Sequence, residues 1–227
     1  MDFMIYITGD THGEQGRFRD FLAHGEMHWT ENDTLIVCGD FGYLFRDNAM
    51  ERIFLNELAK KPYTICFCDG NHENFPAIYA YPEKEWHGGK VHEIRPNILH
   101  LMRGQIFTIE EHTFFVMGGA YSRDKAMRTA GVSWWKEELP NDAEYKEAAA
   151  NLKAHDFKVD YILSHTAPTE IIRRMAWTPD PHDGELTGFL EWVMYETDFK
   201  KWFFGHLHRD EEVGEKHRAL LFDVVTV

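Results

Sequence analysis

Cysteine is scarce in this chain, with three residues among 227, Cys38, Cys66 and Cys68. An odd number without a secretory context does not make a disulfide framework, so we expect three reduced thiols. Cys66 and Cys68 lie two apart on an expected strand and therefore share one face. Because paired Cys-x-x-Cys spacing is absent, buried free cysteines are a better interpretation than a zinc site.

Long apolar runs are also absent. No stretch approaches the roughly 20 residues that span a bilayer, and the N-terminal sequence MDFMIYITGD contains no basic region followed by an apolar region and a cleavage site. We therefore expect a cytoplasmic protein with no membrane partner. The chain has no internal repeat and no linker rich in Gly, Ser or Pro, which favours a single domain over residues 1–227.

Positively charged residues are few. The chain has 24 Lys and Arg and 38 Asp and Glu, so the formal net charge is −14. Broad binding to nucleic acid or to anionic lipid depends on Lys and Arg that neutralise phosphate. The sequence thus predicts that nucleic acid is not a partner. A local site for a small anion is compatible with this charge.

Short apolar runs that end at a turn or at a histidine are typical of buried strands. The expected strands are residues 3–8, 35–38, 63–68, 113–117, 161–164, 201–204 and 219–227. Segments with apolar residues along one helix face are expected helices, at residues 48–60, 142–154, 169–177 and 186–195. This alternation indicates a sheet-rich α/β fold. Residues 76–112 and 121–140 are the least regular, and we predict them to be loop or rim insertions.

Histidine is abundant, with 14 residues, and several stand where an expected strand ends. The polar residues at these strand ends are Asp10, His12, Asp40, Asn71, His72, His165, His206 and His208. Taken singly, each is more often a turn residue or a helix cap. Carboxyl ends of parallel strands meet at one sheet edge, so together they are expected to converge. Mixed nitrogen and oxygen donors without thiolate suit divalent Mn, Fe, Zn or Ni.

The number of candidate ligands favours two ions over one. The candidates are Asp10, His12, Asp40, Asn71, His165, His206 and His208. They are too many for one ion with an open position and suit two ions that share a carboxylate, for which Asp40 is the natural bridge. Two carboxylates against two divalent cations leave the site positive, which suits a phosphoryl group and a water of lowered pKa.

The order of these short blocks along the chain resembles that of the calcineurin-like metallophosphoesterases. The blocks are Asp10-Thr11-His12, Gly39-Asp40, Gly70-Asn71-His72-Glu73, His165 and Gly205-His206-Leu207-His208. The stretch Gly118-Gly119-Ala120-Tyr121-Ser122-Arg123-Asp124, followed by Trp134 and Trp135, resembles a subgroup of small bacterial and phage members. The resemblance implies a four-layer α/β/β/α sandwich with two mixed sheets and a dinuclear metal site at the C-terminal ends of the strands.

The same resemblance implies a role for each residue. One ion would be held by Asp10, His12, Asp40 and His208, and the other by Asp40, Asn71, His165 and His206. His72 would be the histidine that is not a ligand and that stabilises the transition state or protonates the leaving oxygen. Asp40 and His72 are thus the predicted catalytic residues.

The second block departs from the pattern of the protein Ser/Thr phosphatases of the family. They carry GDxVDRG, whereas this chain has Gly39-Asp40-Phe41-Gly42-Tyr43 and lacks the second Asp and the Arg. Because that Arg would grip the phosphate, protein-phosphatase activity is not expected. Arg46, Arg123 and Arg128 are candidate substrate-binding replacements, and the sequence does not choose among them.

The sequence therefore predicts a metal-dependent phosphoesterase that hydrolyses small phosphate mono- or diesters through a metal-bridging hydroxide. Two divalent ions are the expected cofactors, with Mn preferred over Fe, Zn or Ni. One alternative is a non-catalytic metal-binding scaffold of the same fold, which should lack ligands, and none is missing. Another is a nuclease, whose basic groove is not evident at a charge of −14. The oligomeric state is left open.

Overall fold

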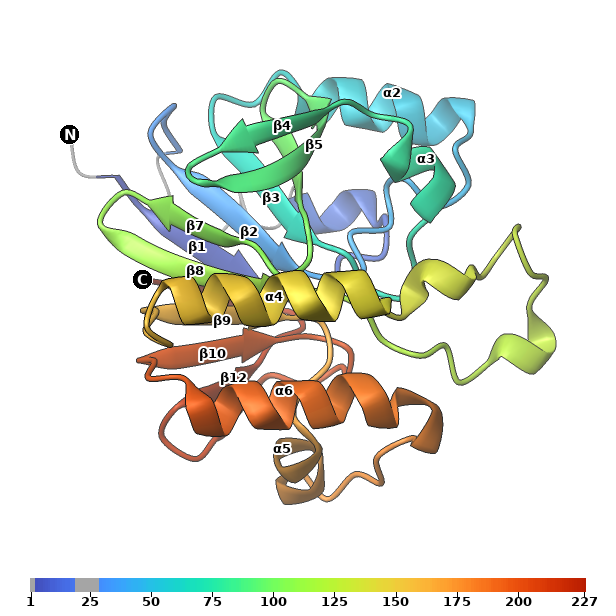
Figure 1. Cartoon of the computed structure of the whole chain (residues 1–227). Helices are drawn as coiled ribbons and strands as arrows, with labels where there is room; N and C mark the ends of the chain where they lie inside the picture. The colour runs from blue at the N-terminus through green and yellow to red at the C-terminus, as the bar shows by residue number, and fades with distance from the viewer. Residues whose placement is uncertain (1–2, 19–28) are drawn as a thin grey trace.

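The structure is a computed structural model that describes residues 3–18 and 29–227. Two β-sheets lie face to face between layers of helices (Figure 1). The first sheet contains β1 (Ile5–Thr8), β2 (Thr34–Cys38), β3 (Thr64–Cys68), β4 (Glu83–Trp86), β5 (Gly89–Arg95), β6 (Ile98–Leu101) and β13 (Val224–Thr226). The second contains β7 (Ile106–Ile109), β8 (His112–Met117), β9 (Tyr161–Ser164), β10 (Lys201–Phe204), β11 (Glu211–Val213) and β12 (His217–Ala219).

The helices whose two ends both lie in the described residues are α2 (Ala49–Leu58), α3 (Phe75–Tyr79), α4 (Asp142–Ala154), α5 (Thr169–Arg174) and α6 (Gly184–Glu196). Residues 15–18 are also helical. Three short 3₁₀ turns are η1 (Lys125–Met127), η2 (Lys136–Glu138) and η3 (Pro181–Asp183). Helix α4 begins with a capping box, in which Asn141 and Glu144 bind each other's backbone N–H groups. This local signal explains why the sequence pattern predicts the bounds of α4 correctly.

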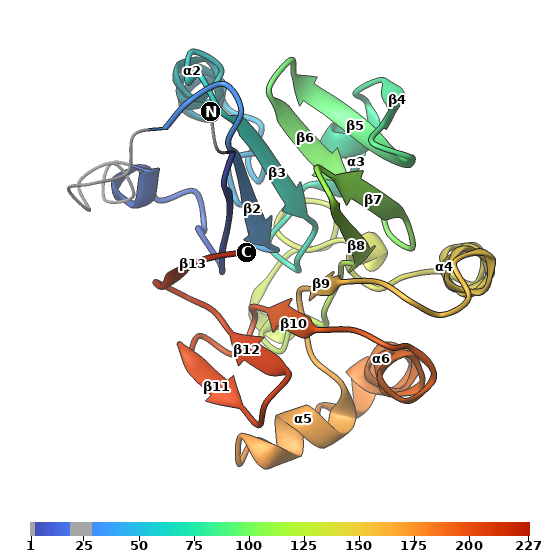
Figure 2. The ribbon, with the colours of Figure 1, turned by 90° about the vertical axis from the view of Figure 1, so that its left-hand side faces the viewer.

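Both sheets are mixed, and parallel strands form the centre of each. In the first sheet the order is β13-β1-β2-β3-β6-β5-β4, with β1, β2, β3 and β6 paired in parallel. In the second sheet the order is β11-β12-β10-β9-β8-β7, and β12, β10, β9 and β8 pair in parallel. Figure 2 shows the two sheets from the side, one above the other. The parallel arrangement brings the carboxyl ends of the central strands to one edge.

Apolar side chains fill the space between the sheets. Ile7 and Ile36 of the first sheet pack with Phe114, Leu163 and Phe203 of the second. Because parallel strands are covered on both faces, their sequences read as continuous apolar runs. The runs at residues 161–164 and 201–204 therefore predict β9 and β10 with their correct ends.

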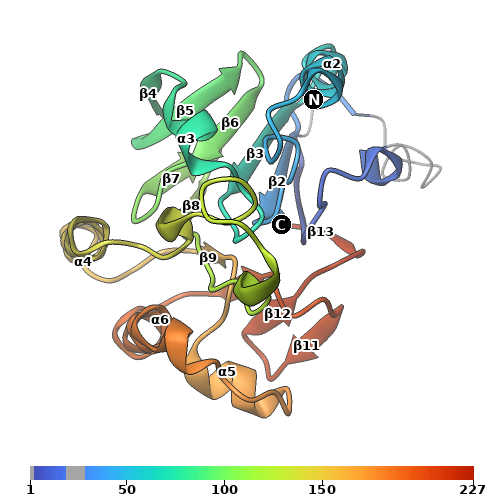
Figure 3. The same ribbon diagram turned by 90° about the vertical axis from the view of Figure 1, so that its right-hand side faces the viewer.

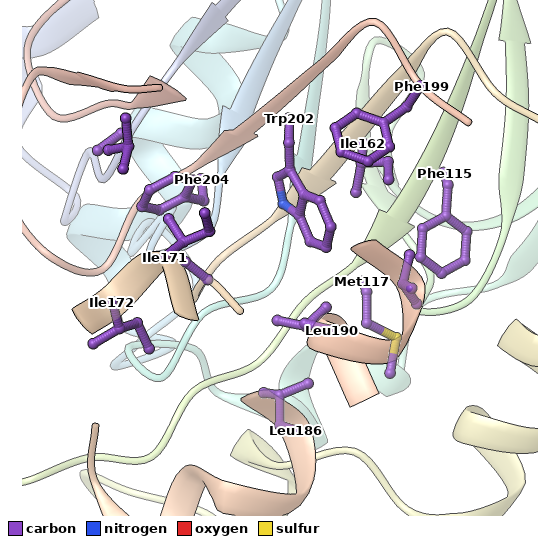
Figure 4. Packing of buried hydrophobic residues seen from close by; sticks show 14 of the residues in the cluster. Phe115, Met117, Ile162, Ile171, Ile172, Leu186, Leu190, Phe199, Trp202 and Phe204 are labelled. Atoms are coloured by element: carbon purple, nitrogen blue, oxygen red, sulfur yellow. The ribbon is translucent and has the colours of Figure 1, made fainter. Parts of the chain in front are cut away.

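Helices cover the outer face of each sheet. Leu55 and Leu58 of α2 pack on the first sheet. On the second sheet, Leu190 of α6 and Ile171 of α5 pack near Trp202 of β10, as Figure 4 shows. The predicted four-layer α/β/β/α sandwich with two mixed sheets is confirmed.

The prediction of a loop insertion over residues 76–112 is wrong. This segment carries β4, β5, β6 and β7, and it contributes to both sheets. β4 lacks an apolar run, since Glu83, Lys84 and Glu85 are all exposed on a sheet edge, whereas β6 (ILHL) and β7 (IFTI) are short, mostly apolar runs that the prediction does not include. Residues 121–140, by contrast, hold only η1, η2 and an isolated bridge between Ala130 and Trp134.

The prediction of a single strand at residues 219–227 is also wrong. β12 ends at Ala219 in the second sheet, and β13 begins at Val224 in the first. The chain crosses from one sheet to the other between them, at a change of direction that an apolar pattern does not reveal. The three cysteines are free and buried in the core between the sheets, and Cys38 faces Cys68 across β2 and β3.

Candidate metal centre

The predicted site residues follow strands of both sheets and meet at one edge. Asp10, Asp40 and Asn71 come after β1, β2 and β3 of the first sheet. His165 and His206 come after β9 and β10 of the second. Figure 3 views the molecule from this side, with the segment of residues 121–140 in front of the strand ends. The structure thus brings together residues that lie far apart in the sequence.

Several of the turns that carry these side chains have a strained backbone. The residues with positive φ include His12 (49°), Asp40 (47°), His206 (61°) and His208 (50°). Residues other than glycine adopt this conformation at a cost and mostly where the surrounding structure enforces it. Strain at four residues in three neighbouring turns is typical of a functional site.

Four of the residues form a compact group. One potential ligand atom from each of Asp10, His12, Asp40 and His208 lies within 4.8 Å of the other three. His12 Nε2 lies 3.0 Å from His208 Nε2, and His208 Nε2 lies 3.2 Å from Asp10 Oδ2. Converging ring nitrogens and carboxylate oxygens are the donor set of a divalent transition metal.

A second group shares Asp40 with the first. His165 Nε2 lies 3.3 Å from Asp40 Oδ1 and 3.2 Å from Asn71 Oδ1. The Nδ1 atom of His165 lies 3.0 Å from the carbonyl oxygen of Cys38, so we assign the ring proton to Nδ1 and the lone pair to Nε2. The other oxygen of Asp40, Oδ2, lies 3.7 Å from His12 Nδ1. Asp40 therefore presents one oxygen to each group, as a bridging carboxylate does.

His206 lies beside the second group. Its backbone N–H donates to both carboxylate oxygens of Asp10, at 3.1 Å, and its ring centroid is 5.0 Å from that of His165. The backbone of one sheet thus orients a carboxylate of the other. All seven predicted ligands lie in this cluster, and their assignment to particular ions is a prediction from the family resemblance.

The electrostatics of the cluster favour a cation. Burial opposes the charge of Asp40, but His165, His72 and His12 outweigh it and hold the pKa of Asp40 well below its usual range. Burial lowers the pKa of His165, but Asp40 and Asp10 outweigh it and raise that pKa to about 10. Two nearly inaccessible carboxylates therefore favour positive charge between them, and divalent ions would supply it. The donors present fit the metal pair that the resemblance implies.

Ser122 and Glu138 support the cluster, and the sequence did not single them out for a role. The amide nitrogen of Asn71 donates to Ser122 Oγ at 3.2 Å, which turns Asn71 Oδ1 toward His165. The backbone N–H of Ser122 donates to the buried carboxylate of Glu138 at 3.1 Å, and Lys125 pairs with the same oxygen. A weak signal was the position of Ser122 within the irregular segment of residues 121–140, because long irregular segments often carry function.

Glu73 holds the turn after β2. It is fully buried, and its carboxylate accepts hydrogen bonds from the backbone N–H groups of Phe41, at 2.7 Å, and Gly42, at 3.4 Å. Burial raises the pKa of Glu73 well above its usual value, and the charge of Asp40 adds to the shift. The glutamate of the Asn71-His72-Glu73 block thus fixes the loop that carries Asp40.

His72 is placed by two contacts. Its backbone N–H donates to Asp40 Oδ1 at 2.8 Å, and its Nε2 lies 2.8 Å from an Nη2 donor of Arg128. Burial lowers the pKa of His72, and Arg128 lowers it further against the opposing effect of Asp40. Arg128 is itself held by Asp124 at 2.7 Å and by the carbonyl oxygen of Ser133 at 3.2 Å.

The three candidate arginines line two different cavities. A cavity of about 190 Å³ is lined by residues of the cluster and by two of the candidate arginines: Asp40, Asn71, His206, His208, Arg123 and Arg128. A neighbouring cavity of about 510 Å³ contains Arg46. The structure therefore places Arg123 and Arg128 next to the cluster and Arg46 in the adjoining cavity.

A comparison with models of protein families gives a match. A family model described as calcineurin-like phosphoesterase matches residues 3–210 of the chain. No curated protein matches it. Among the helices that the structure describes, none combines the length and the apolar character that crossing a membrane requires.

Proposed function

Because the chain belongs to the calcineurin-like phosphoesterase family, we propose that it hydrolyses small phosphate mono- or diesters at the cluster of strand-end residues. The family implies metal-dependent phosphoesterase activity. The observation that carries the proposal for this chain is the group of Asp10, His12, Asp40 and His208, with ligand atoms within 4.8 Å of one another.

The proposed ligand sets are those of the family pattern. Asp10, His12, Asp40 and His208 would hold one divalent ion, and Asp40, Asn71, His165 and His206 the other. When bound, two such ions lower the pKa of a water molecule and offset negative charge on the phosphoryl group. Mn²⁺ is the ion that we propose to test first, because imidazole and carboxylate donors without thiolate suit it.

The neighbouring residues have separate tasks in this proposal. Arg123 and Arg128 bind the phosphoryl oxygens, because a guanidinium can donate two parallel hydrogen bonds to such a group. Asp40 positions His72 through the backbone N–H, and Arg128 contacts the imidazole. The Nε2 atom of His72 faces the guanidinium of Arg128, and the pKa of His72 is lowered, so the neutral ring would carry its proton on Nδ1. We propose that His72 donates a hydrogen bond through this Nδ1–H group.

Small esters are preferred over long polyanions in this proposal. The exterior of the chain is strongly acidic, with a formal charge of −14, so a nucleic acid would be repelled along its length. A small ester needs to enter only a local site whose carboxylates are outweighed by divalent ions. The cavity of about 190 Å³ over Asp40 and Asn71 is of the right order for a phosphoryl group.

The test is hydrolysis of 4-nitrophenyl phosphate and bis(4-nitrophenyl) phosphate in the presence of Mn²⁺. Asp40→Asn removes the charge that both ligand groups share, and we expect kcat/KM to fall at least about 100-fold, as for the loss of a positioned electrostatic group. The matched control is Asp156→Asn in the turn after α4, where the side chain is exposed. Asp156→Asn is expected to behave as wild type.

Two results would contradict the proposal. One is equal, background hydrolysis by wild type and Asp40→Asn with Mn²⁺, Fe²⁺, Zn²⁺ and Ni²⁺. The other is less than about one bound ion per chain after purification in Mn²⁺, since a loaded centre of this kind holds two. The ratio of monoester to diester hydrolysis in wild type identifies the preferred ester class.

A further inference from the structure

Two cavities meet at His72, and they differ in size. The cavity over Asp40 and Asn71 measures about 190 Å³, and the one on the other side of His72 measures about 510 Å³. Pockets for small molecules typically measure about 300–1,000 Å³. The smaller cavity therefore accommodates a phosphoryl group, and the larger one has room for the body of a ligand.

The larger cavity adjoins the candidate metal centre through His12. The ring of His12 lines this cavity, and its Nε2 lies 3.0 Å from His208 Nε2 of the centre. His72 also lines it, and the two rings meet edge to face with centroids 5.1 Å apart. An ester bound over the ligands, with its leaving oxygen beside His72, would extend its leaving group past these rings into the larger cavity.

Apolar and aromatic side chains form much of the wall. Phe45 and Phe54 are half-buried, and Met50 is 62% exposed. The Phe45 ring lies 5.8 Å from that of His72, and the Phe54 ring stacks on Tyr43 at 4.8 Å. Rings and a thioether on one wall make favourable contacts with a flat aromatic group.

Arg46 supplies a positive charge to this cavity, and Glu51, which also lines it, supplies a negative one. Asn48 accepts a hydrogen bond from the backbone of Glu51 at 3.0 Å, and Glu51 in turn accepts the backbone N–H groups of Arg46 and Asp47. These polar side chains are therefore occupied in shaping the loop. In the part of the chain that the structure describes, the Arg46 guanidinium has no ion-pair partner, so it is available to an anionic ligand group.

We propose that the larger cavity is a leaving-group subsite, and that it selects phosphate esters whose leaving group carries both an aromatic ring and a negative charge. The inference rests on the proposed function and names its substrate class. Phe45, Phe54 and Met50 would contact the ring, and Arg46 would pair with its anionic substituent. Hydrolysis forms a bond from phosphorus to the water oxygen and breaks the bond to the aryl oxygen, which leaves as a phenol with a proton from that water.

The experiment compares phenyl phosphate with 3-carboxyphenyl phosphate in Mn²⁺. A meta carboxylate changes the basicity of the phenol little, so the kcat/KM ratio of the two esters reports recognition of the charge. Arg46→Gln is expected to lower this ratio about tenfold, the size of one charge-assisted hydrogen bond. The matched control is Arg173→Gln on α5, where the side chain is exposed, and it is expected to keep the wild-type ratio.

Two further measurements cover the ring and the binding step. Met50→Ala is expected to lower the kcat/KM ratio of 2-naphthyl to phenyl phosphate about threefold, because a contact between sulfur and the second ring is lost. Calorimetry of 3-carboxyphenylphosphonate binding to the protein in Mn²⁺ needs no turnover. Arg46→Gln is expected to raise its Kd about tenfold and to leave the unfolding temperature unchanged, since Arg46 is exposed.

The outcomes separate the subsite from the proposed function. If phenyl phosphate is hydrolysed and Arg46→Gln leaves both the ester ratio and the phosphonate Kd unchanged, the subsite is overturned and the proposed function stands. If no ester is hydrolysed with any metal, the proposed function fails. An Arg46-dependent phosphonate Kd would then still support anion recognition in this cavity, and an unchanged Kd would overturn it.

Discussion

Glycine stands beside the candidate ligands where the structure leaves no room for a side chain. A Cβ atom on Gly70 would lie 2.1 Å from Asp40 Oδ1 and 2.4 Å from the Asp40 backbone nitrogen. A Cβ atom on Gly205 would lie 2.2 Å from Asp10 Oδ1. These contacts are far inside van der Waals distance. The glycines of the motif blocks therefore allow the turns of neighbouring strands to approach the buried carboxylates.

We expect Gly70→Ala to damage the site more than the fold. The added methyl group must displace Asp40, and a shift of about 1 Å at a catalytic centre can cost roughly 100-fold in rate. Gly188→Ala in α6 is the matched control, because a Cβ there meets nothing within 4 Å, and it should raise the free energy of unfolding by about 0.5–1 kcal/mol. Phenyl phosphate hydrolysis and denaturant unfolding measure both effects. Equal activity of the two variants would contradict this explanation of Gly70.

The sequence predicts the members of the cluster better than the residues that support them. His165 is recognisable because it directly follows an apolar run, and parallel strands bring such positions together. Ser122 is different, since its contact with Asn71 depends on how the segment of residues 121–140 crosses the strand ends. For the same reason the sequence does not tell whether Arg46 or Arg128 lies beside the cluster, because the position of each depends on an irregular loop.

Strands and helices are predictable where one local signal dominates. β9 and β10 are buried, apolar and central, so a short run of apolar residues marks each of them. β4 is an edge strand whose Glu83, Lys84 and Glu85 are exposed, and its strand character comes from pairing with β5, which itself pairs with β6. Tertiary context therefore decides β4, which is why this part of residues 76–112 looks irregular in the sequence.

The beginning of α6 holds a titratable link to the loop beside the site. Asp183 is 2% exposed and accepts a hydrogen bond from the backbone N–H of Tyr121. Burial raises the pKa of Asp183 to about 6, with Asp180 adding to the shift against the effect of the Tyr121 N–H. The folded state therefore binds this proton more tightly than the unfolded state, whose carboxyl has a pKa of about 3.9. The contribution of Asp183 to stability falls as the pH rises from about 4 to about 6.

We expect Asp183→Asn to remove this pH dependence while keeping an oxygen that can accept the Tyr121 N–H. Relative to wild type, the variant should gain on the order of 2 kcal/mol in the free energy of unfolding between pH 4 and pH 7. Denaturant titrations at half-unit pH steps measure the difference, and Asp156→Asn, exposed in the turn after α4, should show a nearly constant difference from wild type. A constant difference for Asp183→Asn as well would mean that this carboxyl titrates near its ordinary pKa.

At the scale of the molecule, the candidate centre joins the two sheets. Asp10, Asp40 and Asn71 belong to turns of the first sheet, whereas His165 and His206 belong to turns of the second. The segments that supply them span most of the chain, so the centre assembles only when both sheets have formed and packed. Ions bound there would hold the sheets together, and their binding energy would appear as folding stability.

Mn²⁺ is therefore expected to raise the unfolding temperature of the whole chain. An ion concentration of about 100 times the Kd contributes about 2.7 kcal/mol, which for a chain of this size corresponds to roughly 5–10 °C. The acidic exterior, at a formal charge of −14, could also attract Mn²⁺ weakly at many places, so the shift alone does not identify the centre. Asp40→Asn keeps nearly all of that exterior but loses the carboxylate between the two ligand groups, and it should lose most of the shift. Asp156→Asn removes one exposed carboxylate instead and should keep it. Differential scanning calorimetry with and without Mn²⁺ compares the three proteins. A shift of equal size in all three would place the bound ions on the surface and not at the candidate centre.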